Sequence, residues 1–565
     1  MKARILAIFL ILFLGLGSIA AKLFTIQIQH GDRLTERAAK QYQRLLPLVS
    51  RRGTIFDRAG RELAVSLRVS SAFAQPGAIS QPAETARLLA PILGQPASEL
   101  QARLTTDKTF TWLQRQLEPR QAEAISDLGL KGIGLFPESR RYYPRQELAA
   151  HILGMVGLDD RGLEGVEHLY DDVLGGKPQF VVAQQDALGR LVFRQEEPEP
   201  KMPIFDVYLT IDEVLQYIAE RELARAVERS GAKAGTAVIL DPANGELLAL
   251  ANQPTFNPNH YKKAGSAAKR DRAATDYLEP GSIFKVILTA GALEEGIVHP
   301  TDQFYGENGA IEVSGITIRD HEKYGWLTVR QILAQSSNVG AIKIGQKLGK
   351  SLYYHYMSAF GFGSLTGVDL PGETPGLIRR PNGWSALSLP VLSLGQEVSV
   401  TPIQFATAFA AVANGGILMR PHVVRGLRSQ DGTIARNVEP VMVRRVISEP
   451  TARTLLEMLT SVVEEGTGKE AAVAGYTVSG KTGTAQKVDP ATGRYSHKKI
   501  VASFVGAVPA EAPRLVILVI IDEPETLRWG GSIAAPTFRE IALDALKYLK
   551  VPPSPSRDVR LVRAG

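Results

Sequence analysis

The spacing of apolar residues changes from one segment of the chain to the next, and it predicts helices in some segments and strands in others. The first apolar run covers residues 5–21 and is long enough for a helix that crosses a membrane. Two shorter runs, 236–241 and 246–251, flank an Asn-Gly turn, which is typical of a β-hairpin. Two later runs, 500–507 and 515–521, are rich in Val and Ile and predict further strands.

Helical patterns separate the early strands from the late ones. A helix is predicted over 214–229, several more fill the middle of the chain, and the last begins near residue 534 with a proline in its first turn. The order of strands, helices and strands favours an α+β fold. In such a fold, helices cover an antiparallel sheet, and we expect the first and last strands to be neighbours.

The N-terminal apolar run has a basic flank, Lys2 and Arg4, and is followed by Lys22 and a further apolar stretch. This arrangement is typical of a membrane-targeting segment with its basic end inside the cell. Small residues at 18 and 20 also fit the cleavage site of a signal peptide. We favour an uncleaved anchor, because a signal peptide has an apolar core of only about 7–15 residues. The rest of the chain would then lie outside the cytoplasm.

The amino-acid composition of the chain excludes several classes of functional site. The chain has 565 residues, of which 44% are hydrophobic and 22% charged, as expected for a globular protein of two or three domains. It contains no cysteine, which excludes disulfides, zinc–thiolate sites and cysteine nucleophiles. The net charge of +7 is spread along the chain. His260, His321 and His497 stand in polar loops without a partner at ligand spacing, so we interpret them as surface residues and expect no metal or cofactor.

The candidate chemistry is centred on Ser282. A Pro-Gly turn places this serine at the start of an apolar run, which predicts a helix with Ser282 in its first turn. Lys285 follows three residues later, on the same face of the helix. If burial keeps the lysine neutral, it can take the proton of the serine hydroxyl. The pattern alone is weak, because a chain of this length contains about two such strings by chance.

Two later strings strengthen the pattern. Ser-Ser-Asn at residues 336–338 is the only Ser-x-Asn string in the chain, and Lys-Thr-Gly at 481–483 is the only one of its kind. They follow Ser282 in the order found in the active-serine enzymes that recognise penicillin. From residue 51 to residue 538 the chain resembles a penicillin-binding protein. The resemblance implies the fold of that family, a helix-flanked antiparallel sheet, and a serine acyl-enzyme.

The resemblance also implies a role for each residue of the first two strings. Ser282 would attack a peptide carbonyl, and Lys285 would be its base. Ser336 would relay protons between Lys285 and Lys481. Asn338 would hold the amide of the donor peptide through its side-chain hydrogen bonds.

The third string would bind the substrate. Lys481 would place a positive charge near the terminal carboxylate, and Thr482 or Thr484 would donate a hydroxyl to it. Gly483, which has no side chain, would let the substrate pair with the edge of this strand. By the same resemblance, the backbone N–H groups of Ser282 and Thr484 would form an oxyanion hole, in which each donor is worth about 3 kcal/mol.

The region between the anchor and the catalytic part shows no nucleophile with a base. Residues 51–64, 140–144 and 162–167 resemble the sequence boxes of the non-catalytic region of class B penicillin-binding proteins. The charges of residues 51–64 would form a structural cluster of salt bridges around a hairpin at 54–65. The space is too short for a glycosyltransferase domain as well as a pedestal, so the resemblance implies a monofunctional transpeptidase.

The sequence thus predicts four parts. They are a membrane anchor over 1–28, an elongated α/β pedestal of dimerisation type over 29–205, a transpeptidase domain over 206–548 and a disordered tail over 549–565.

The leading hypothesis is a peptidoglycan D,D-transpeptidase on the outer side of the cell membrane. It would cross-link stem peptides that end in D-Ala–D-Ala and would be acylated by β-lactams. Residues 479–486, 500–506 and 522–524 look most like the septal branch, the FtsI-like proteins of cell division, while the elongation branch stays open. As partners, the resemblance implies an FtsW-like polytopic glycosyltransferase and other division proteins, and no nucleic acid.

Two other classes remain as alternatives. A D,D-carboxypeptidase or β-lactamase would pass the acyl group to water, and Glu373 lies in the interval where a β-lactamase often has a second base, although its neighbours indicate a turn. A β-lactam sensor would bind without turnover, but such sensors need several membrane spans and the sequence shows one. Trp529 stands where the family commonly has a tyrosine, and we assign it no role.

Overall fold

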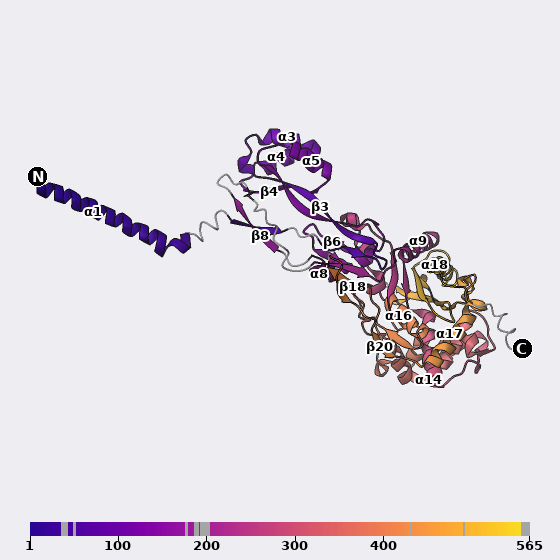
Figure 1. Ribbon diagram of the computed structural model, residues 1–565. Helices are drawn as coiled ribbons and strands as arrows, with labels where there is room; N and C mark the ends of the chain where they lie inside the picture. Colours follow the sequence, from indigo (N-terminus) through magenta and orange to yellow (C-terminus); the bar gives the residue numbers. More distant parts are fainter. Residues whose placement is uncertain are drawn as a thin grey trace. The chain divides into compact units, whose positions relative to one another are not determined.

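The computed structural model describes most of the chain (Figure 1). The described residues are 1–34, 43–48, 52–175, 179–185, 191–192, 204–429, 431–489 and 492–554. Contacts between residues divide the chain into two compact units. The smaller unit holds residues 1–51, 69–139 and 175–203, and the larger unit holds residues 52–68, 140–174 and 204–565. Two segments of the predicted pedestal therefore belong to the same unit as the predicted transpeptidase domain.

The smaller unit begins with the predicted N-terminal helix. α1 (Lys2–Phe24) continues into a π-helical turn (Thr25–Gln29), and none of the side chains of α1 is buried. The segment is long and apolar enough to cross a membrane, with a mean hydropathy of 2.4. It fits a single-pass membrane anchor.

Helices pack on one face of a sheet in the smaller unit (Figure 1). The helices are α3 (Pro82–Leu93), α4 (Ala97–Leu104) and α5 (Pro119–Asp127), and the strands are β3 (Glu62–Ala74), β4 (Thr111–Leu117) and β5 (Ile133–Tyr142), of which β3 begins and β5 ends in the larger unit. Leu89, Leu100 and Leu113 are buried between the two layers. A second sheet joins β1 (Gln43–Leu48), β8 (Gln179–Gln185) and β9 (Leu191–Val192).

In the larger unit, the predicted hairpin is formed by β2 (Ile55–Phe56) and the start of β3. β10 (Phe205–Leu209) pairs in parallel with β2 and antiparallel with β18 (Val424–Ser429), which pairs with β19 (Ile434–Asn437). Five short elements follow β5. They are α6 (Ala150–Leu153), β6 (Met155–Val156), β7 (Gly162–Glu164), α7 (Gly165–Leu169) and α8 (Asp171–Gly175), and the third box covers β7 and the start of α7.

A buried ion-pair cluster joins the three sequence boxes. Arg52 Nε donates to one carboxylate oxygen of Glu167 at 2.6 Å, and Arg141 Nε donates to the other at 2.5 Å. Arg52 also pairs with Asp171 at 2.6 Å. The side chains of Arg52 and Glu167 have no exposed surface. The predicted pairing of charges around the hairpin is confirmed for Arg61 and Asp57, which lie 3.5 Å apart, whereas the partners of Arg52 lie outside the stretch 51–64. Arg51 lies outside the described part of the chain.

A five-stranded antiparallel sheet forms the centre of the larger unit. Its strands are, in order across the sheet, β12 (Leu247–Gln253), β11 (Ala234–Leu240), β23 (Leu515–Asp522), β22 (Arg494–Val508) and β21 (Ser479–Asp489). β11 and β23 are neighbours, with Val238 opposite Leu518, so the predicted pairing of the first and last strands is confirmed. β21 lies at the edge of this sheet.

Helices cover both faces of the central sheet, because successive strand residues point to opposite faces. Ala237 and Ile239 share a core with α9 (Glu213–Ser230) and α18 (Ala534–Tyr548), which lie side by side (Figure 1). Val238 and Leu240 share the other core with helices of the middle of the chain. These helices are α12 (Lys285–Glu294), α14 (Asn338–Ala359), α16 (Pro402–Ala413) and α17 (Glu449–Glu464). Every residue of α16 is buried.

Short elements connect these layers. They are α10 (Ser266–Lys269), α11 (Arg272–Thr275), β13 (Gln303–Tyr305), β14 (Ala310–Val313), β15 (Ile316–Arg319), β16 (Trp326–Thr328), α13 (Val329–Ala334), α15 (Ser388–Leu392), β17 (Ile417–Met419) and β20 (Met442–Arg445). The β14–β15 hairpin and the segment after it are important for the site described below.

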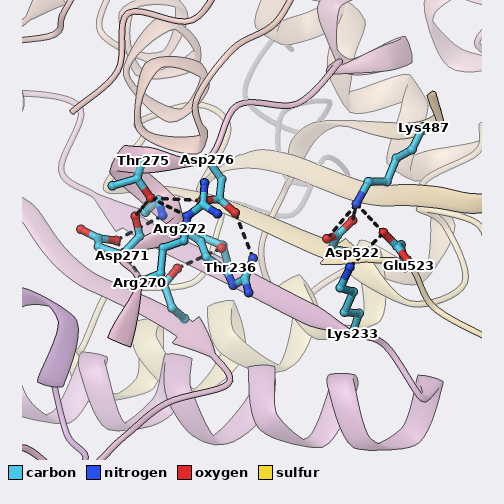
Figure 2. A network of polar contacts seen from close by, with 12 residues as sticks. Lys233, Thr236, Arg270, Asp271, Arg272, Thr275, Asp276, Lys487, Asp522 and Glu523 are labelled. Carbon is cyan, nitrogen blue, oxygen red and sulfur yellow. Dashed lines mark hydrogen bonds and ion pairs between the residues drawn. The ribbon is translucent and has the colours of Figure 1, made fainter. Parts of the chain in front are cut away.

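Ion pairs tie the edge strand β21 to the sheet. Figure 2 shows Lys487 of β21 reaching Asp522 at 2.8 Å and Glu523 at 2.6 Å. Asp522 ends β23, which is two positions away from β21 in the sheet. A second polar cluster in Figure 2, centred on Asp276, lies in the loop that leads to Ser282. Both clusters therefore support segments that carry residues of the predicted site.

The start of the predicted tail is held in place. Tyr476 Oη donates to the carbonyl of Val551 at 2.7 Å, and the N–H of Ser554 donates to the carbonyl of Gly475 at 2.8 Å. The structure therefore moves the start of the tail from residue 549 to beyond Ser554. Residues 555–565 lie outside the described part of the chain.

The cluster around Glu167 leads to a prediction about stability. Replacing Glu167 by Gln leaves the buried guanidinium of Arg141 without a charged partner, so we expect the free energy of unfolding to fall by about 3–5 kcal/mol. Urea unfolding of the full-length protein in detergent measures this loss. Glu164→Gln is the matched control, because Glu164 is exposed on the neighbouring strand and should change stability by less than about 0.5 kcal/mol. Equal losses in both variants would contradict the prediction.

Candidate active site

Ser282 lies in a 3₁₀ turn (Gly281–Phe284) that leads into α12. The helix proper begins at Lys285, so the predicted first turn is tighter than an α-helix, and side chains three residues apart nearly eclipse each other in such a turn. Gly281 has a φ of +59°, and a Cβ there would lie 2.9 Å from the carbonyl oxygen of Thr484. The glycine thus allows the turn that carries Ser282 to lie directly against β21.

Lys285 is buried beneath this turn, with 1% of its surface exposed. Its Nζ donates to the carbonyl of Ser336 at 2.6 Å and to Oδ1 of Asn338 at 2.8 Å, and it lies 3.4 Å from the Ser336 hydroxyl. Burial lowers the pKa of Lys285 to about 7, against a smaller opposing effect of the Asp320 carboxylate. Phe284, its neighbour in the sequence, is fully buried as well.

The Ser-Ser-Asn string forms the junction between α13 and α14. Ser336 has a φ of +56°, an uncommon conformation for a serine, and its carbonyl accepts the hydrogen bond from Lys285. Ser337 caps α14, since its hydroxyl accepts a bond from the N–H of Gly340 at 3.0 Å. Asn338 is the first residue of the helix. The string therefore serves as a helix cap and as the binding site of the lysine ammonium at once.

Lys481 is the second buried lysine of the site, with no exposed surface. Burial lowers its pKa far below the ordinary value, and the charge of Lys285 lowers it further. Its Nζ donates to the carbonyl of Thr482 at 3.1 Å. Among the described residues Ser336 contacts Lys285, and no hydrogen bond joins it to Lys481, so the relay between the two lysines stays a prediction.

Thr482, Gly483 and Thr484 lie on the edge strand β21. The hydroxyl of Thr484 accepts a hydrogen bond from the N–H of Gly530 at 3.2 Å. Gly483 is also required by packing inside the protein. A Cβ at this position would lie 2.3 Å from Ser503 Oγ and 2.9 Å from a side-chain carbon of Ile283, so the glycine permits packing of the strand against the serine turn. The predicted pairing of substrate with this strand stays a prediction.

The three strings line one cavity of about 830 Å³. Its lining includes Ser282, Ser336, Asn338 and the residues 482–484. The sequence therefore identified residues from three distant segments that the fold brings together. The two lysine side chains lie beneath this lining, buried in the protein.

Three aromatic residues line the cavity in addition to the predicted residues. His321 and Trp529 line the cavity and meet edge to face, with ring centres 4.8 Å apart. His321 is exposed, as the sequence predicted, and its loop also lines the cavity. Burial and the charge of Lys285 lower the pKa of His321. Tyr324, three residues further on, also lines the cavity.

Asp320 was missed by the sequence analysis. Its carboxylate accepts a hydrogen bond from Ser337 Oγ at 2.8 Å and from the N–H of Val339 at 3.1 Å, and it accepts a third from the N–H of Asn338. A single aspartate in a loop before a helix forms no recognisable pattern, and 17 residues separate it from the serine that it contacts.

Comparisons with known proteins agree with this geometry. A family model described as the penicillin-binding protein transpeptidase domain matches residues 235–543, and one described as the penicillin-binding protein dimerisation domain matches residues 47–209. The peptidoglycan D,D-transpeptidase FtsI of Escherichia coli is 35% identical over 557 residues, which are 96% of this chain and 91% of that protein. The stage V sporulation protein D of Bacillus subtilis is 35% identical over 95% of this chain and 84% of that protein.

Solved structures show the same similarity. A peptidoglycan synthetase of Bifidobacterium adolescentis gives a TM-score of 0.73 at 28% identity and covers 91% of this chain and 98% of that one. Penicillin-binding protein 3 of Mycobacterium tuberculosis in complex with aztreonam gives a TM-score of 0.70 at 28% identity, with the same coverage.

The burial of Lys285 leads to a prediction about pH and stability. The pKa is about 7 in the folded protein and near 10.5 in the unfolded chain. Between these values the unfolded chain binds a proton that the folded protein does not. Burial of the charged lysine therefore lowers the free energy of unfolding in full below pH 7, and this loss becomes smaller as the pH rises. Relative to Lys285→Met, the wild-type free energy of unfolding should therefore rise by about 1.4 kcal/mol per pH unit from pH 7.5 to 9.5.

Urea unfolding of the full-length protein in detergent at several pH values measures this difference. Lys350→Met is the control, because Lys350 is exposed and its replacement should leave the pH dependence unchanged. A constant difference between wild type and Lys285→Met across this range would show that Lys285 is protonated in the folded protein.

Proposed function

Because the chain is a class B penicillin-binding protein and a peptidoglycan D,D-transpeptidase, we propose that Ser282 is the nucleophile that forms its acyl-enzyme. The observation that carries the proposal is that Ser282 lines a cavity three residues before Lys285, which is buried and has a pKa of about 7. A lysine with this pKa is largely neutral at physiological pH and can accept a proton, which an exposed lysine cannot.

Acylation would begin when Ser282 Oγ attacks the carbonyl of the penultimate D-Ala of a stem peptide. Lys285 takes the hydroxyl proton as the new C–O bond forms. When the tetrahedral intermediate collapses, the C–N bond breaks and the proton passes to the amine of the departing D-Ala. Backbone N–H groups of Ser282 and Thr484 stabilise the negative oxygen of the intermediate. An amine of a second stem peptide then attacks the ester and completes the cross-link.

The other motif residues would bind and orient the donor peptide. Asn338 holds the peptide amide, and the hydroxyls of Thr482 and Thr484 bind the terminal carboxylate. Ser336 relays protons to and from Lys285, which its hydroxyl approaches to 3.4 Å. Lys481 lies near the carboxylate beneath the cavity lining, and the negative charge of the arriving substrate raises its lowered pKa again so that it takes up a proton and places a positive charge there.

Hydrolysis is less well supported than transfer to an amine. The predicted second base of a β-lactamase, Glu373, accepts hydrogen bonds from the N–H and hydroxyl of Thr366 and from the N–H of Gly367. It is therefore the carboxylate of a turn, as the sequence indicated, and it is not among the residues that line the cavity.

We further propose a role in septal wall synthesis during cell division. The support is the resemblance of the segments 479–486, 500–506 and 522–524 to FtsI-like proteins, together with the similarity to FtsI along almost the whole chain. In this role the N-terminal helix anchors the protein in the cytoplasmic membrane, the catalytic domain lies on the outer side, and an FtsW-like glycosyltransferase and other division proteins are its partners.

The nucleophile is tested by labelling with a fluorescent penicillin. We expect the full-length protein in detergent to form a covalent adduct that persists for hours, and Ser282→Ala to form none. Ser266→Ala is the matched control, because Ser266 begins an exposed Ser-x-x-Lys string in α10 and should label like the wild type. Equal labelling of wild type and Ser282→Ala would contradict the assignment, and an adduct that is lost within seconds would indicate a β-lactamase.

The division role is tested by depletion of the protein in its host. We expect cells without it to grow into filaments that lack septa, and a Ser282→Ala copy to leave the filaments unrescued. Cells that instead become round or swollen would place the protein in the elongation machinery.

A further inference from the structure

The segment that follows the β14–β15 hairpin contacts the Ser-Ser-Asn string through both backbone and side chain. The carbonyl of Arg319 accepts a hydrogen bond from Asn338 Nδ2 at 2.8 Å. The Asp320 carboxylate accepts bonds from the Ser337 hydroxyl and from the first two N–H groups of α14. These N–H groups have no partner within the helix, since they belong to its first turn. The carboxylate thus completes the cap that Ser337 begins.

These contacts fix the direction of the Asn338 amide. Because Nδ2 is bound to the carbonyl of Arg319, the oxygen Oδ1 must point the other way, where it accepts the bond from Lys285 at 2.8 Å. The second acceptor of Lys285 is the carbonyl of Ser336, directly before the cap. Both acceptors that hold the lysine therefore depend on the position of the start of α14.

We propose that Asp320 is a positioning residue for acylation, which holds the start of α14 so that Asn338 and Ser336 present their oxygens to Lys285 beneath Ser282. The inference rests on the proposed role of Lys285 as the base. It adds a residue that no motif contains and that reaches the reacting atoms only through its neighbours.

The charge of Asp320 also acts on the lysine directly. Three charged or titratable groups affect Lys285 or are affected by it: Asp320 and His321 from the segment after β15, and Lys481 from β21. Asp320 is the anion among them, and its charge raises the pKa of Lys285 against the larger lowering effect of burial. Loss of this charge should therefore lower the pKa of Lys285 further and make the lysine neutral at a lower pH.

The two effects give Asp320→Asn a distinctive result. The substituted amide has nearly the same shape and can still accept the backbone bonds of α14, but it carries no charge. We expect the rate of acylation by a fluorescent penicillin, measured from pH 5.5 to 9 on the full-length protein, to reach half of its plateau at a lower pH than in the wild type. Asp320→Ala, which loses all three bonds, should reduce the plateau by about tenfold or more, because the oxygens that hold Lys285 move.

Glu312→Gln is the matched control, because it removes the same charge from an exposed position on β14 of the same hairpin and should keep the wild-type profile. A midpoint in Asp320→Asn equal to that of the wild type would overturn the proposal, even if the variant melts at a lower temperature, because a purely structural residue changes stability and not the midpoint. If Asp320→Ala does not fold, Asp320→Asn alone decides the question. Failure of the wild type to be acylated at Ser282 would instead contradict the proposed function.

Discussion

Lys285 and Lys481 lie inside the larger unit with 1% and 0% of their surfaces exposed. An ammonium group that leaves water loses a large hydration energy, and a few hydrogen bonds in the interior replace only part of it. Burial therefore lowers the pKa of both lysines, and the repulsion between them lowers the pKa of Lys481 further. The site around them depends on this constraint, because a lysine that keeps its ordinary pKa would be a poor base at neutral pH.

The fold meets the constraint by combining apolar walls with a few fixed acceptors. The serine turn and the first residues of α12 supply Phe284 and its buried neighbours, and the start of α14 supplies two oxygens to Lys285. β21 holds Lys481 at the edge of a sheet whose two faces are both covered by helices. The large cores on these faces, including the fully buried α16, stabilise the folded protein. This stabilisation offsets the free energy that is lost when two lysines are buried.

The sequence predicted the helices, the strands and the residues of the site better than it predicted the contacts between those residues. Apolar periodicity located four of the five strands of the central sheet and the last helix, and three short strings located Ser282, Ser336 and Thr482 at one cavity. It placed His321 at the surface, where it is exposed, but could not show that its loop lines the cavity. It missed Asp320, since a capping carboxylate from another loop depends on tertiary packing and leaves no spacing to detect. Gly483 lines the cavity, and its lack of a side chain also serves internal packing, which the sequence did not indicate.

The two lysines are chemically alike, and their surroundings make them different. Lys285 has a carboxylate near it in the free protein, so its pKa stays near 7, whereas the effects on Lys481 all lower the pKa. A substrate that brings its own carboxylate to Lys481 would raise the pKa of Lys481, because the new anion favours the charged form of the lysine nearest to it. The proton then held by Lys481 would in turn repel a proton on Lys285, so that binding of the correct substrate would itself favour the neutral base beneath Ser282. On this argument, the terminal carboxylate of the donor peptide is part of the acid–base chemistry and not only a handle for binding.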